Sequence, residues 1–431
     1  MREASGLRAW LPAQRWFAGK SAPILSVDVT DEADMGGGVR LAVADVVSAG
    51  LPAARYFLLL DADGNAPAGK DPLALPEVRQ RWFERLRRSA HLPGGAATFE
   101  FQWLVGPAPA SASSRLLSAE QSNTSVLYYD AASTPRWLCK LFRRLMPGEN
   151  PEFEVPRALA LHTPFRHIPA VRARVIYSDY TLAVLQDFVP NQGDGWQYVL
   201  RGLPDRAAGE RLLADLERLG RRTAELHLAL ASIHGDLAFK PEPVAPADLE
   251  RWRGRAAAAV RSPEMRPYAT LLQPWVRRLS GPTSGLEACL GLSRIRLHGD
   301  YHLGQVLKTE EDFVIFDFEG EPARPIPERR QKGCVLQDVA GMLRSFSYAA
   351  HSARRPEWEA GARAAFLDAY LAAIGSASGL VPNNNAALTA ALSFFECEKA
   401  VYELAYELNH RPDWVAVPLA GLNRLLATPT S

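Results

Sequence analysis

Two short stretches of the chain decide its fold: Leu297-His-Gly-Asp-Tyr-His-Leu-Gly-Gln305 and Phe313-Val-Ile-Phe-Asp-Phe-Glu319. Both are bounded by apolar residues of the strand-forming type, and Glu311 and Asp312 lie between them as a polar turn. The pattern predicts a compact hairpin over residues 294–319. The surrounding chain, from about residue 194 onward, has mostly helical periodicity instead.

Each strand of the predicted hairpin ends at an acid. We expect Asp300 to follow the first strand and Asp317 to end the last, with the amide of Gln305 between them. Carboxylate and amide oxygens are suitable ligands for magnesium, and a carboxylate also orients an acceptor hydroxyl. Phosphoryl transfer needs mainly this positioning and charge neutralisation, so the set predicts a phosphotransferase.

A second His-Gly-Asp tripeptide, at residues 234–236, provides an internal control. Pro241 stands five residues beyond Asp236 and Arg253 stands seventeen beyond it, and neither offers an oxygen ligand for a metal. This tripeptide also follows a helical run over 212–230 rather than a strand. We therefore interpret it as a segment without a catalytic role.

The composition excludes several classes of protein. The chain has 431 residues, 49 Lys and Arg against 48 Asp and Glu, and a net charge of +1, so we expect neither a nucleic-acid nor a membrane partner. Its 4 cysteines are far apart and form no metal or disulfide pattern. There is no apolar run of the roughly 18 residues needed for a membrane span, and no signal peptide, which predicts a cytoplasmic protein.

Three regions follow one another along the chain. Residues 1–105 predict an α+β cap, in which the arginines of a helix over 76–90 are interpreted as a solvated face. Residues 106–190 begin with a linker rich in Pro, Ala and Ser and predict a small, β-rich, nucleotide-binding lobe with one helix over 151–161. Residues 191–431 predict a helical lobe with the catalytic loop and a sugar site, and we expect a ligand cleft between the two lobes. The expected strands are 24–29, 39–46, 56–60, 115–119, 125–129, 137–142, 171–178 and 181–188.

The catalytic stretch resembles that of the protein-kinase-like superfamily, in the branch that contains aminoglycoside phosphotransferases and choline kinases. That branch has the pattern H-G-D-x4-N followed by an Asp–Phe metal motif, and Gln305 stands here in place of its Asn. The resemblance implies an α+β, bilobal, protein-kinase-like fold with a small β-rich lobe and a large helical lobe. It also implies Asp300 as the catalytic base, Gln305 and Asp317 as Mg²⁺ ligands, and His298 and Asp338 as structural supports of the loop.

The same resemblance implies nucleotide-binding residues upstream. Lys140 is a single cation in an otherwise apolar strand and is expected to contact the α and β phosphates of ATP. Glu154, on the helix over 151–161, is expected to pair with it, and Glu152 is the competing choice. The other candidates lie in a loop without glycine and at the expected hinge: Ser122, Asn123, Thr124, Ser125, Gln186 and Phe188.

An ordered series of motifs, from about residue 10 to residue 425, resembles bacterial maltokinase more closely than the superfamily. The motifs are Trp10–Lys20, Glu120–Ser125, Lys140–Arg144, Asp194–Trp196, His298–Gln305, Asp317–Pro322, Asp338–Ser345 and Tyr402–Trp414. The resemblance implies an extra N-terminal cap and ATP-dependent phosphorylation of the anomeric hydroxyl of maltose. The products would be maltose 1-phosphate and ADP, for α-glucan (glycogen) synthesis from trehalose. A trehalose-converting enzyme is the expected partner of the cap.

A helix near the C-terminus is the predicted sugar site. Tyr402 and Tyr406 are four residues apart, as are Glu403 and Glu407, so each pair shares a helix face. Carboxylates accept hydrogen bonds from sugar hydroxyls, and aromatic rings pack on sugar C–H surfaces. With the resemblance, these four residues and Asp194 are candidates for binding maltose.

Two other functions stay open at this point. A glucosamine or aminoglycoside kinase of the same fold would want several acids around its cationic acceptor, and Asp194, Glu396, Glu403 and Glu407 would also meet that need. A nucleotide-binding pseudokinase is the less favoured alternative. Such a protein would be expected to lack Asp300, Asp317 or Lys140, and all three are present.

Overall fold

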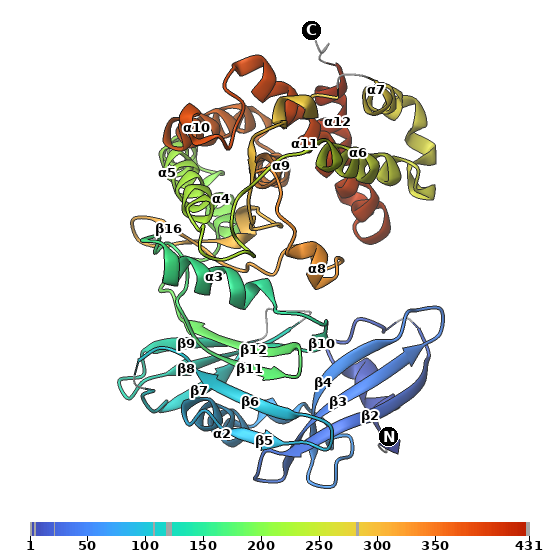
Figure 1. The fold of residues 1–431 in the computed structure, drawn as a ribbon, viewed down its shortest axis with the longest axis vertical. Coiled ribbons are helices and arrows are strands. Elements are labelled where there is room, and N and C mark those ends of the chain that lie inside the picture. Colours follow the sequence, from blue (N-terminus) through green and yellow to red (C-terminus); the bar gives the residue numbers. More distant parts are fainter. Residues whose placement is uncertain are drawn as a thin grey trace. The chain divides into compact units, whose positions relative to one another are not determined.

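The computed structural model describes residues 2–3, 6–20, 22–106, 108–117, 123–281 and 284–427 (Figure 1). The chain forms two compact units, each built from segments that are distant in sequence. The first comprises Met1–Arg157, Pro169–Val189 and Arg324–Glu328, and the second comprises Ala158–Ile168, Pro190–Ala323 and Arg329–Ser431. Within the described ranges, no helix is long and apolar enough to cross a membrane.

Two antiparallel sheets form the first unit. The cap sheet has the strand order β1-β2-β3-β4-β10, and the seven-stranded sheet has the order β5-β6-β11-β12-β9-β8-β7. The cap sheet contains β1 (Arg2–Glu3), β2 (Ile24–Asp34), β3 (Val39–Ser48), β4 (Ala54–Asp61) and β10 (Arg144–Leu145). The seven-stranded sheet contains β5 (His91–Pro93), β6 (Thr98–Trp103), β7 (Ser113–Leu116), β8 (Asn123–Tyr129), β9 (Pro135–Phe142), β11 (Val171–Tyr177) and β12 (Tyr180–Asp187). Strand pairing between β6 and β11 therefore crosses the predicted boundary at residue 105.

The predicted strands of this unit are confirmed, and most extend one to five residues beyond the sequence pattern. Strands β1, β5, β6 and β10 have no counterpart in the prediction. The three short ones, β1, β5 and β10, contain too few residues for any periodicity to appear. In β6 the buried Phe99 and Phe101 alternate with polar residues, which is a strand signal that the sequence does contain.

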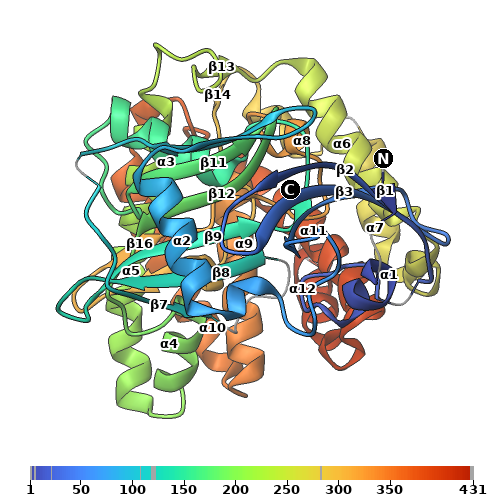
Figure 2. The ribbon, with the colours of Figure 1, turned by 90° about the horizontal axis from the view of Figure 1, so that it is seen from below.

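Helix α2 (Pro76–Arg87) fills the core between the strands of this unit. Its buried apolar residues recur at helical spacing: Val78, Trp82, Phe83 and Leu86. They form one apolar cluster with Phe57 of the cap sheet and with Phe101 of the seven-stranded sheet. Figure 2 shows α2 in front of the strands of the seven-stranded sheet. The helix contributes apolar residues to a core that both sheets share.

The arginines of α2 correct the expectation of a solvated helix face. Arg79 is buried and donates to the carbonyls of Leu73 and Ala74 at 2.7 and 2.8 Å. Arg81 and Arg85 donate to carbonyls in the turn between β2 and β3, each at 3.0 Å. These arginines satisfy backbone carbonyls that no strand or helix partner reaches, so they hold α2 against the turns around it.

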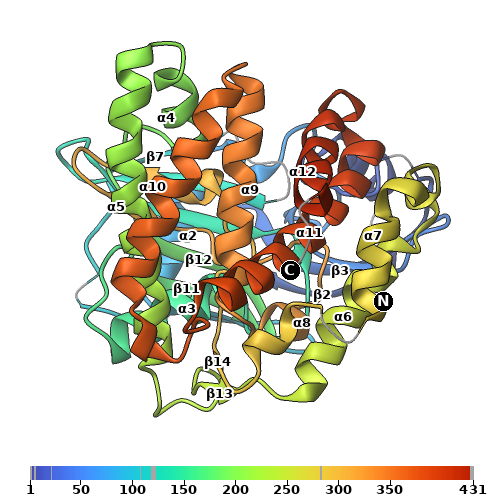
Figure 3. The ribbon, with the colours of Figure 1, turned by 90° about the horizontal axis from the view of Figure 1, so that it is seen from above.

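The second unit is mainly helical (Figure 3). Its helices are α4 (Gly195–Gly202), α5 (Arg206–Ala231), α6 (Pro246–Val260), α7 (Ala269–Ser280), α9 (Leu336–Ser352), α10 (Pro356–Ile374), α11 (Asn385–His410) and α12 (Ala416–Ala427). Helices α5 and α10 pack along each other, and a Cβ on Gly220 would lie only 2.2 Å from the carbonyl oxygen of Phe366. Two small strand pairs complete the unit: β13 (Glu242–Pro243) with β14 (Ser293–Arg294), and β15 (Val306–Lys308) with β16 (Phe313–Ile315).

Arg143 is a fully buried cation at the junction of the two sheets in the first unit. Its guanidinium donates to Asp71 at 2.7 Å and to the hydroxyl of Thr124 at 2.8 Å. It also lies over the ring of Trp16, 5.0 Å from the centroid. This arginine is therefore engaged in holding the cap sheet to the neighbouring strands.

Removal of this cation should destabilise the first unit. We expect Arg143→Ala to lower the free energy of unfolding by about 3–5 kcal/mol, because Asp71 is left without its charged partner. The exposed neighbour provides the control, since Arg144→Ala should change stability by no more than ~0.5 kcal/mol. Denaturant unfolding of both variants is the measurement, and equal stabilities would contradict this role.

Candidate active site

The hairpin of the second unit that precedes Asp317 is shorter than predicted. Strands β15 and β16 pair from Val306 with Ile315 to Lys308 with Phe313, and residues 309–312 form the turn, as expected. Asp317 follows this hairpin, but Asp300 does not share it. The segment before Asp300 forms only the two-residue strand β14 and an isolated bridge between Ile295 and Gly333. The prediction that both acids end strands of one hairpin is therefore wrong for Asp300.

The backbone before Asp300 is held by a carboxylate instead of a strand. Asp338, in the first turn of α9, accepts from the main-chain N–H of His298 at 2.8 Å and from that of Gly299 at 3.0 Å. Burial alone would raise the pKa of Asp338, but His227, whose Nε2 lies 3.3 Å away, and the backbone donors lower it below its ordinary value. The buried carboxylate therefore stays ionised and fixes the start of the loop.

The ring of His298 links the two segments that carry the acids. Its Nδ1 accepts from the amide of Asp300 at 3.4 Å, so its Nε2 carries the hydrogen and donates to the carbonyl of Phe316 at 2.9 Å. The ring also packs against Phe318, with 4.8 Å between centroids. His298 thus joins the main chain of Asp300 to the residue directly before Asp317.

Gln305 and Asp317 flank the same end of the hairpin. The amide of Phe316 donates to the carbonyl of Gln305 at 3.1 Å, which brings the backbone of the next residue, Asp317, close to that of Gln305. One carboxylate and one amide oxygen fit Mg²⁺, which prefers oxygen ligands and shares its shell with phosphates and water. Among the described residues, no group of three or more His, Cys, Asp or Glu is arranged to hold a metal ion.

Two basic groups face the carboxylate of Asp300. Lys399 on α11 lies with Nζ 3.4 Å from Oδ1, and His302 lies with Nε2 4.0 Å from Oδ2. Burial alone would raise the pKa of Asp300, but Lys399, His302 and His298 lower it below its ordinary value. Burial lowers the pKa of His302, whose Nδ1 accepts from the amide of Gly304 at 3.0 Å. The result is an ionised aspartate held beside a protonated lysine.

Lys399 and His302 are candidates that the sequence motifs do not single out. Lys399 stands three residues before Tyr402, and its Nζ lies 5.1 Å from the centroid of that ring. The i,i+3 spacing on one helix was the signal that could have found it. His302 lies inside the catalytic stretch, but nothing in its spacing distinguishes it from a loop residue.

The glutamates proposed for the sugar site already have charged partners. Glu403 accepts from Nε of the buried Arg344 at 2.9 Å, and Glu407 accepts from Arg411 at 2.7 Å and from the hydroxyl of Tyr348 at 3.1 Å. Of the two tyrosines, Tyr402 lies beside Lys399, whereas Tyr406 is 40% exposed and stacks on the ring of His410. The structure thus places Tyr402, but not Tyr406, beside the group that contacts Asp300.

Asp194 is the N-cap of α4, where its carboxylate accepts from the amide of Gln197 at 2.7 Å. Its backbone also forms an isolated bridge with Leu307 of β15. The next residue, Gly195, has no room for a side chain, because a Cβ there would lie 2.8 Å from the carbonyl oxygen of Leu303. The Asp194-Gly195 pair therefore seats α4 against the catalytic loop.

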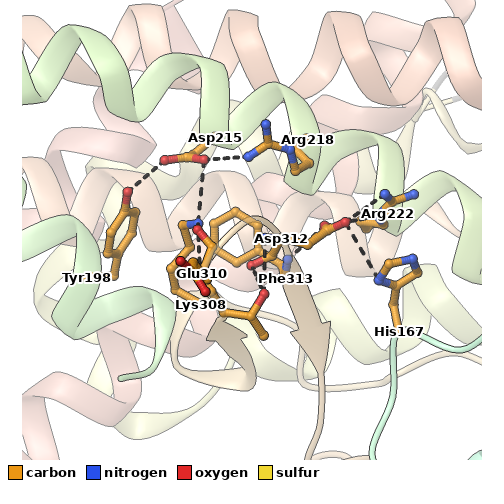
Figure 4. Close-up of polar contacts among 10 residues, drawn as sticks. His167, Tyr198, Asp215, Arg218, Arg222, Lys308, Glu310, Asp312 and Phe313 are labelled. Atoms are coloured by element: carbon orange, nitrogen blue, oxygen red, sulfur yellow. Dashed lines mark hydrogen bonds and ion pairs between the residues drawn. The ribbon is translucent and has the colours of Figure 1, made fainter. Parts of the chain in front are cut away.

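Ion pairs hold the turn of the hairpin against α5 (Figure 4). Arg222 donates to both carboxylate oxygens of Asp312, at 2.7–3.1 Å. The buried Lys308 lies 3.8 Å from Asp215, which also accepts from the hydroxyl of Tyr198 at 2.7 Å. These contacts fix the turn of the hairpin. Because β15 and β16 are short, they also restrain the opposite end, which carries Gln305 and Asp317.

The nucleotide-binding candidates lie in the first unit. Lys140 is buried in β9 and lies between Ser125 of β8 and Val184 of β12 in the strand register. Glu152 and Glu154 are both buried in the first turn of α3 (Pro151–His162), so burial does not separate the two candidate partners of Lys140.

Four further nucleotide-binding candidates have defined surroundings. Asn123 begins β8 and pairs with Phe142, while the hydroxyl of Thr124 accepts from Arg143. Gln186 is buried in β12, and the amide of Phe188 donates to the carbonyl of Arg136 at 2.9 Å. Ser122, the other candidate in this loop, lies outside the described residues.

The second His-Gly-Asp tripeptide follows α5, as predicted, and lies in a turn. The carboxylate of Asp236 accepts from the amide of Ala238 at 2.8 Å, and its carbonyl accepts from the amide of Lys240 at 2.7 Å. The neighbouring Leu237 is 84% exposed. This aspartate therefore has a local turn-forming role.

Two family models match the sequence. The phosphotransferase enzyme family matches residues 114–380, and the maltokinase N-terminal cap domain matches residues 10–83. A glucosamine kinase of Mycolicibacterium smegmatis is 29% identical over 426 residues, which cover 93% of this chain and 99% of that protein. A glucosamine kinase of Streptacidiphilus jiangxiensis is 28% identical over 355 residues, which cover 77% of each.

A solved structure has the same fold. It is that of a glucosamine kinase in complex with glucosamine, ADP and inorganic phosphate, and it aligns with a TM-score of 0.67 at 22% identity. The alignment covers 97% of this chain and 99% of that one. The kinase-like fold, with a curled sheet, a helical region and an N-terminal cap, is thereby confirmed.

Removal of the positive charge on Lys399 should make turnover more sensitive to acidic pH. A catalytic base must be ionised to accept a proton, so in that role Asp300 would lose turnover as the pH falls through its pKa. Because Lys399 lowers that pKa, we expect the acid limb of turnover to move to higher pH in Lys399→Met. Lys399→Arg keeps the charge and should keep the parent profile. An identical acid limb in all three proteins would exclude this role of Lys399.

Proposed function

The chain belongs to the phosphotransferase enzyme family, and from this premise we propose that it is an ATP-dependent sugar kinase. It transfers the γ-phosphate of ATP to the anomeric hydroxyl of maltose and releases maltose 1-phosphate and ADP. The match of residues 10–83 to the maltokinase N-terminal cap domain supports maltose as the acceptor. The product serves α-glucan synthesis from trehalose, and the cap docks a trehalose-converting enzyme.

Asp300 orients the acceptor hydroxyl and accepts its proton. Its carboxylate is suited to this role because Lys399 keeps it ionised and contacts only one of its oxygens at 3.4 Å. The main chain around it is fixed by His298 and Asp338, so the carboxylate is positioned before the substrate binds.

Charge neutralisation is divided between two groups of residues. Gln305 and Asp317 would hold magnesium, which would supply positive charge to neutralise the phosphates of ATP. Lys140 contacts the α and β phosphates, and Glu152 or Glu154 keeps its ammonium group in place. Gln186 and Phe188 border the adenine.

The observation that carries the choice of acceptor is the state of the glutamates on α11. All four, Glu396, Glu398, Glu403 and Glu407, form ion pairs with arginines at 2.5–2.8 Å. Lys399, on the same helix, adds a positive charge beside Asp300. An ammonium group on the acceptor would need a carboxylate to pair with, whereas a neutral disaccharide needs only hydrogen-bond partners. The pairing of all four glutamates with arginines, and the positive charge of Lys399, therefore support a neutral sugar as the acceptor.

A glucosamine kinase is the second candidate. The observation that favours it is the name of both curated relatives, one of which aligns over 93% of this chain. Under this alternative, one of the paired glutamates or Asp194 would have to receive the amino group of the substrate.

The first test of the proposal is the product. With ATP and magnesium, we expect maltose to give a phosphate ester that is acid-labile and no longer reducing, because the anomeric oxygen carries the phosphate. A panel of neutral sugars and aminosugars in an ADP-release assay, followed by NMR of the product, measures this. Turnover with glucosamine alone, or a phosphate on a primary hydroxyl, would overturn the proposed reaction at the anomeric hydroxyl of maltose. The proposal that the protein is a kinase would still stand.

The two His-Gly-Asp tripeptides provide matched variants. Asp300→Asn should lower turnover by about 10²–10⁴, the usual effect of losing a general base, while nucleotide binding survives. Asp236→Asn should keep near-parent turnover, because an asparagine can form the same turn. Steady-state kinetics and calorimetric ADP binding are the measurements. An active Asp300→Asn beside an inactive Asp236→Asn would place the catalytic loop at residues 234–236.

A further inference from the structure

The ammonium group of Lys399 is only partly engaged by the protein. Its Nζ lies 3.4 Å from Oδ1 of Asp300 and 5.1 Å from the centroid of the Tyr402 ring. An ammonium group has three N–H donors, and within the part of the chain that the structure describes only Asp300 accepts from one of them. The side chain is 30% exposed, so a bound molecule can reach the other two donors.

Lys399 also carries the positive charge next to the carboxylate of Asp300. Burial alone would lower the pKa of Lys399, but Asp300, Glu403 and Glu321 raise it above the ordinary value for lysine. His302 lies close as well, but burial lowers its pKa, so its ring is neutral at physiological pH. The charge available beside Asp300 therefore belongs to Lys399.

The two oxygens of the Asp300 carboxylate have different surroundings. Oδ1 accepts from Lys399, whereas Oδ2 accepts no hydrogen bond from any residue in the described ranges. The basic group that faces Oδ2 is Nε2 of His302, which at 4.0 Å is too far away for a hydrogen bond. Under the proposed function, on which this inference rests, Oδ2 is therefore the oxygen that receives the acceptor hydroxyl, at about 2.6–3.2 Å.

These distances bring the phosphoryl group within reach of Lys399. In a reactive complex the acceptor oxygen and the phosphorus are about 3–3.5 Å apart. A phosphorus that approaches a hydroxyl held by Oδ2 comes within the range that the flexible four-carbon side chain of a lysine covers. We propose that Lys399 is a catalytic residue in addition to Asp300, and that its ammonium group donates to a non-bridging oxygen of the γ-phosphoryl group during transfer.

The transfer step is balanced with this contact in place. The acceptor oxygen forms a bond to the γ-phosphorus, and the bond from that phosphorus to the β–γ bridging oxygen breaks. ADP leaves with the electron pair of the broken bond, and the hydroxyl proton passes to Oδ2 of Asp300. Lys399 stays protonated throughout and neutralises the negative charge that is spread over the phosphoryl oxygens in the transition state.

The test uses aluminium fluoride, which together with ADP and magnesium mimics a phosphoryl group in transfer. Calorimetry measures the affinity for ADP with and without the fluoride, in the presence of maltose and, separately, of glucosamine. In the parent the fluoride should tighten ADP binding by about 10²-fold, because mimics of the transition state bind more tightly than substrates. Lys399→Met should bind ADP alone like the parent but lose at least about tenfold of this tightening.

Two further variants are the controls for this measurement. Lys399→Arg keeps the positive charge and should keep most of the tightening. The exposed Lys240 provides the matched control, and Lys240→Met should respond like the parent. Lys399→Gln decides the question if Lys399→Met fails to fold.

The Asp300→Asn background separates contact with the phosphoryl group from mere positioning of Asp300. A loss of tightening that Lys399→Met causes both in the parent and in Asp300→Asn supports the proposal. A loss that disappears in Asp300→Asn, or a Lys399→Met variant with the tightening of the parent, overturns it and leaves the proposed kinase standing. No tightening in the parent with either sugar overturns the proposed kinase and this role together. The comparison is made with whichever sugar tightens ADP binding, so it does not depend on maltose as the acceptor.

Discussion

The contact between the carboxylate of Asp338 and two main-chain N–H groups determines the geometry of the whole site. Without it, the amides of His298 and Gly299 would lack partners, at a cost of about 1–3 kcal/mol for each one that is buried. The carboxylate thus replaces the missing neighbouring strand. The ring of His298 then connects this fixed segment to the chain before Asp317. One buried charge thereby positions both acids.

In both units, charged side chains form hydrogen bonds with backbone groups that lie in loops and turns. In the second unit a carboxylate satisfies two N–H groups of the catalytic loop, and in the first unit Arg79, Arg81 and Arg85 satisfy carbonyls of turns. Such contacts are directional and partly shielded from water, so each fixes a turn more firmly than an exposed ion pair would. Arg79, Arg81 and Arg85 are therefore part of the packing of α2 and do not form a solvated surface.

The sequence predicts regular elements and motif order well, and side-chain partners poorly. Helix α2 and strand β9 are predicted because apolar periodicity is a local property of the chain. Side-chain partners are not predicted in this way. Lys399, for example, contacts Asp300 although 99 residues of sequence separate them, and no spacing rule connects the two. The pairing of Glu403 with Arg344 is hidden in the same way, since one residue is on α11 and the other on α9. The extent of the hairpin was mispredicted because the run before His298 resembles a strand. In the structure this run pairs with β13 and with Gly333, and the amides of His298 and Gly299 donate to the side chain of Asp338.

The backbone of Asp317 has a consequence for the evolution of the protein. Its φ of 65° lies in the left-handed region, where a residue with a Cβ costs roughly 1 kcal/mol relative to glycine. Folding alone would favour glycine at this position, and under the proposed function the carboxylate is kept there as a magnesium ligand at a cost in stability. A population selected only for heat resistance would therefore tend to accumulate glycine at position 317 and become more robust while losing its activity. Retention of aspartate through such a selection would be a direct sign that cells still depend on the reaction.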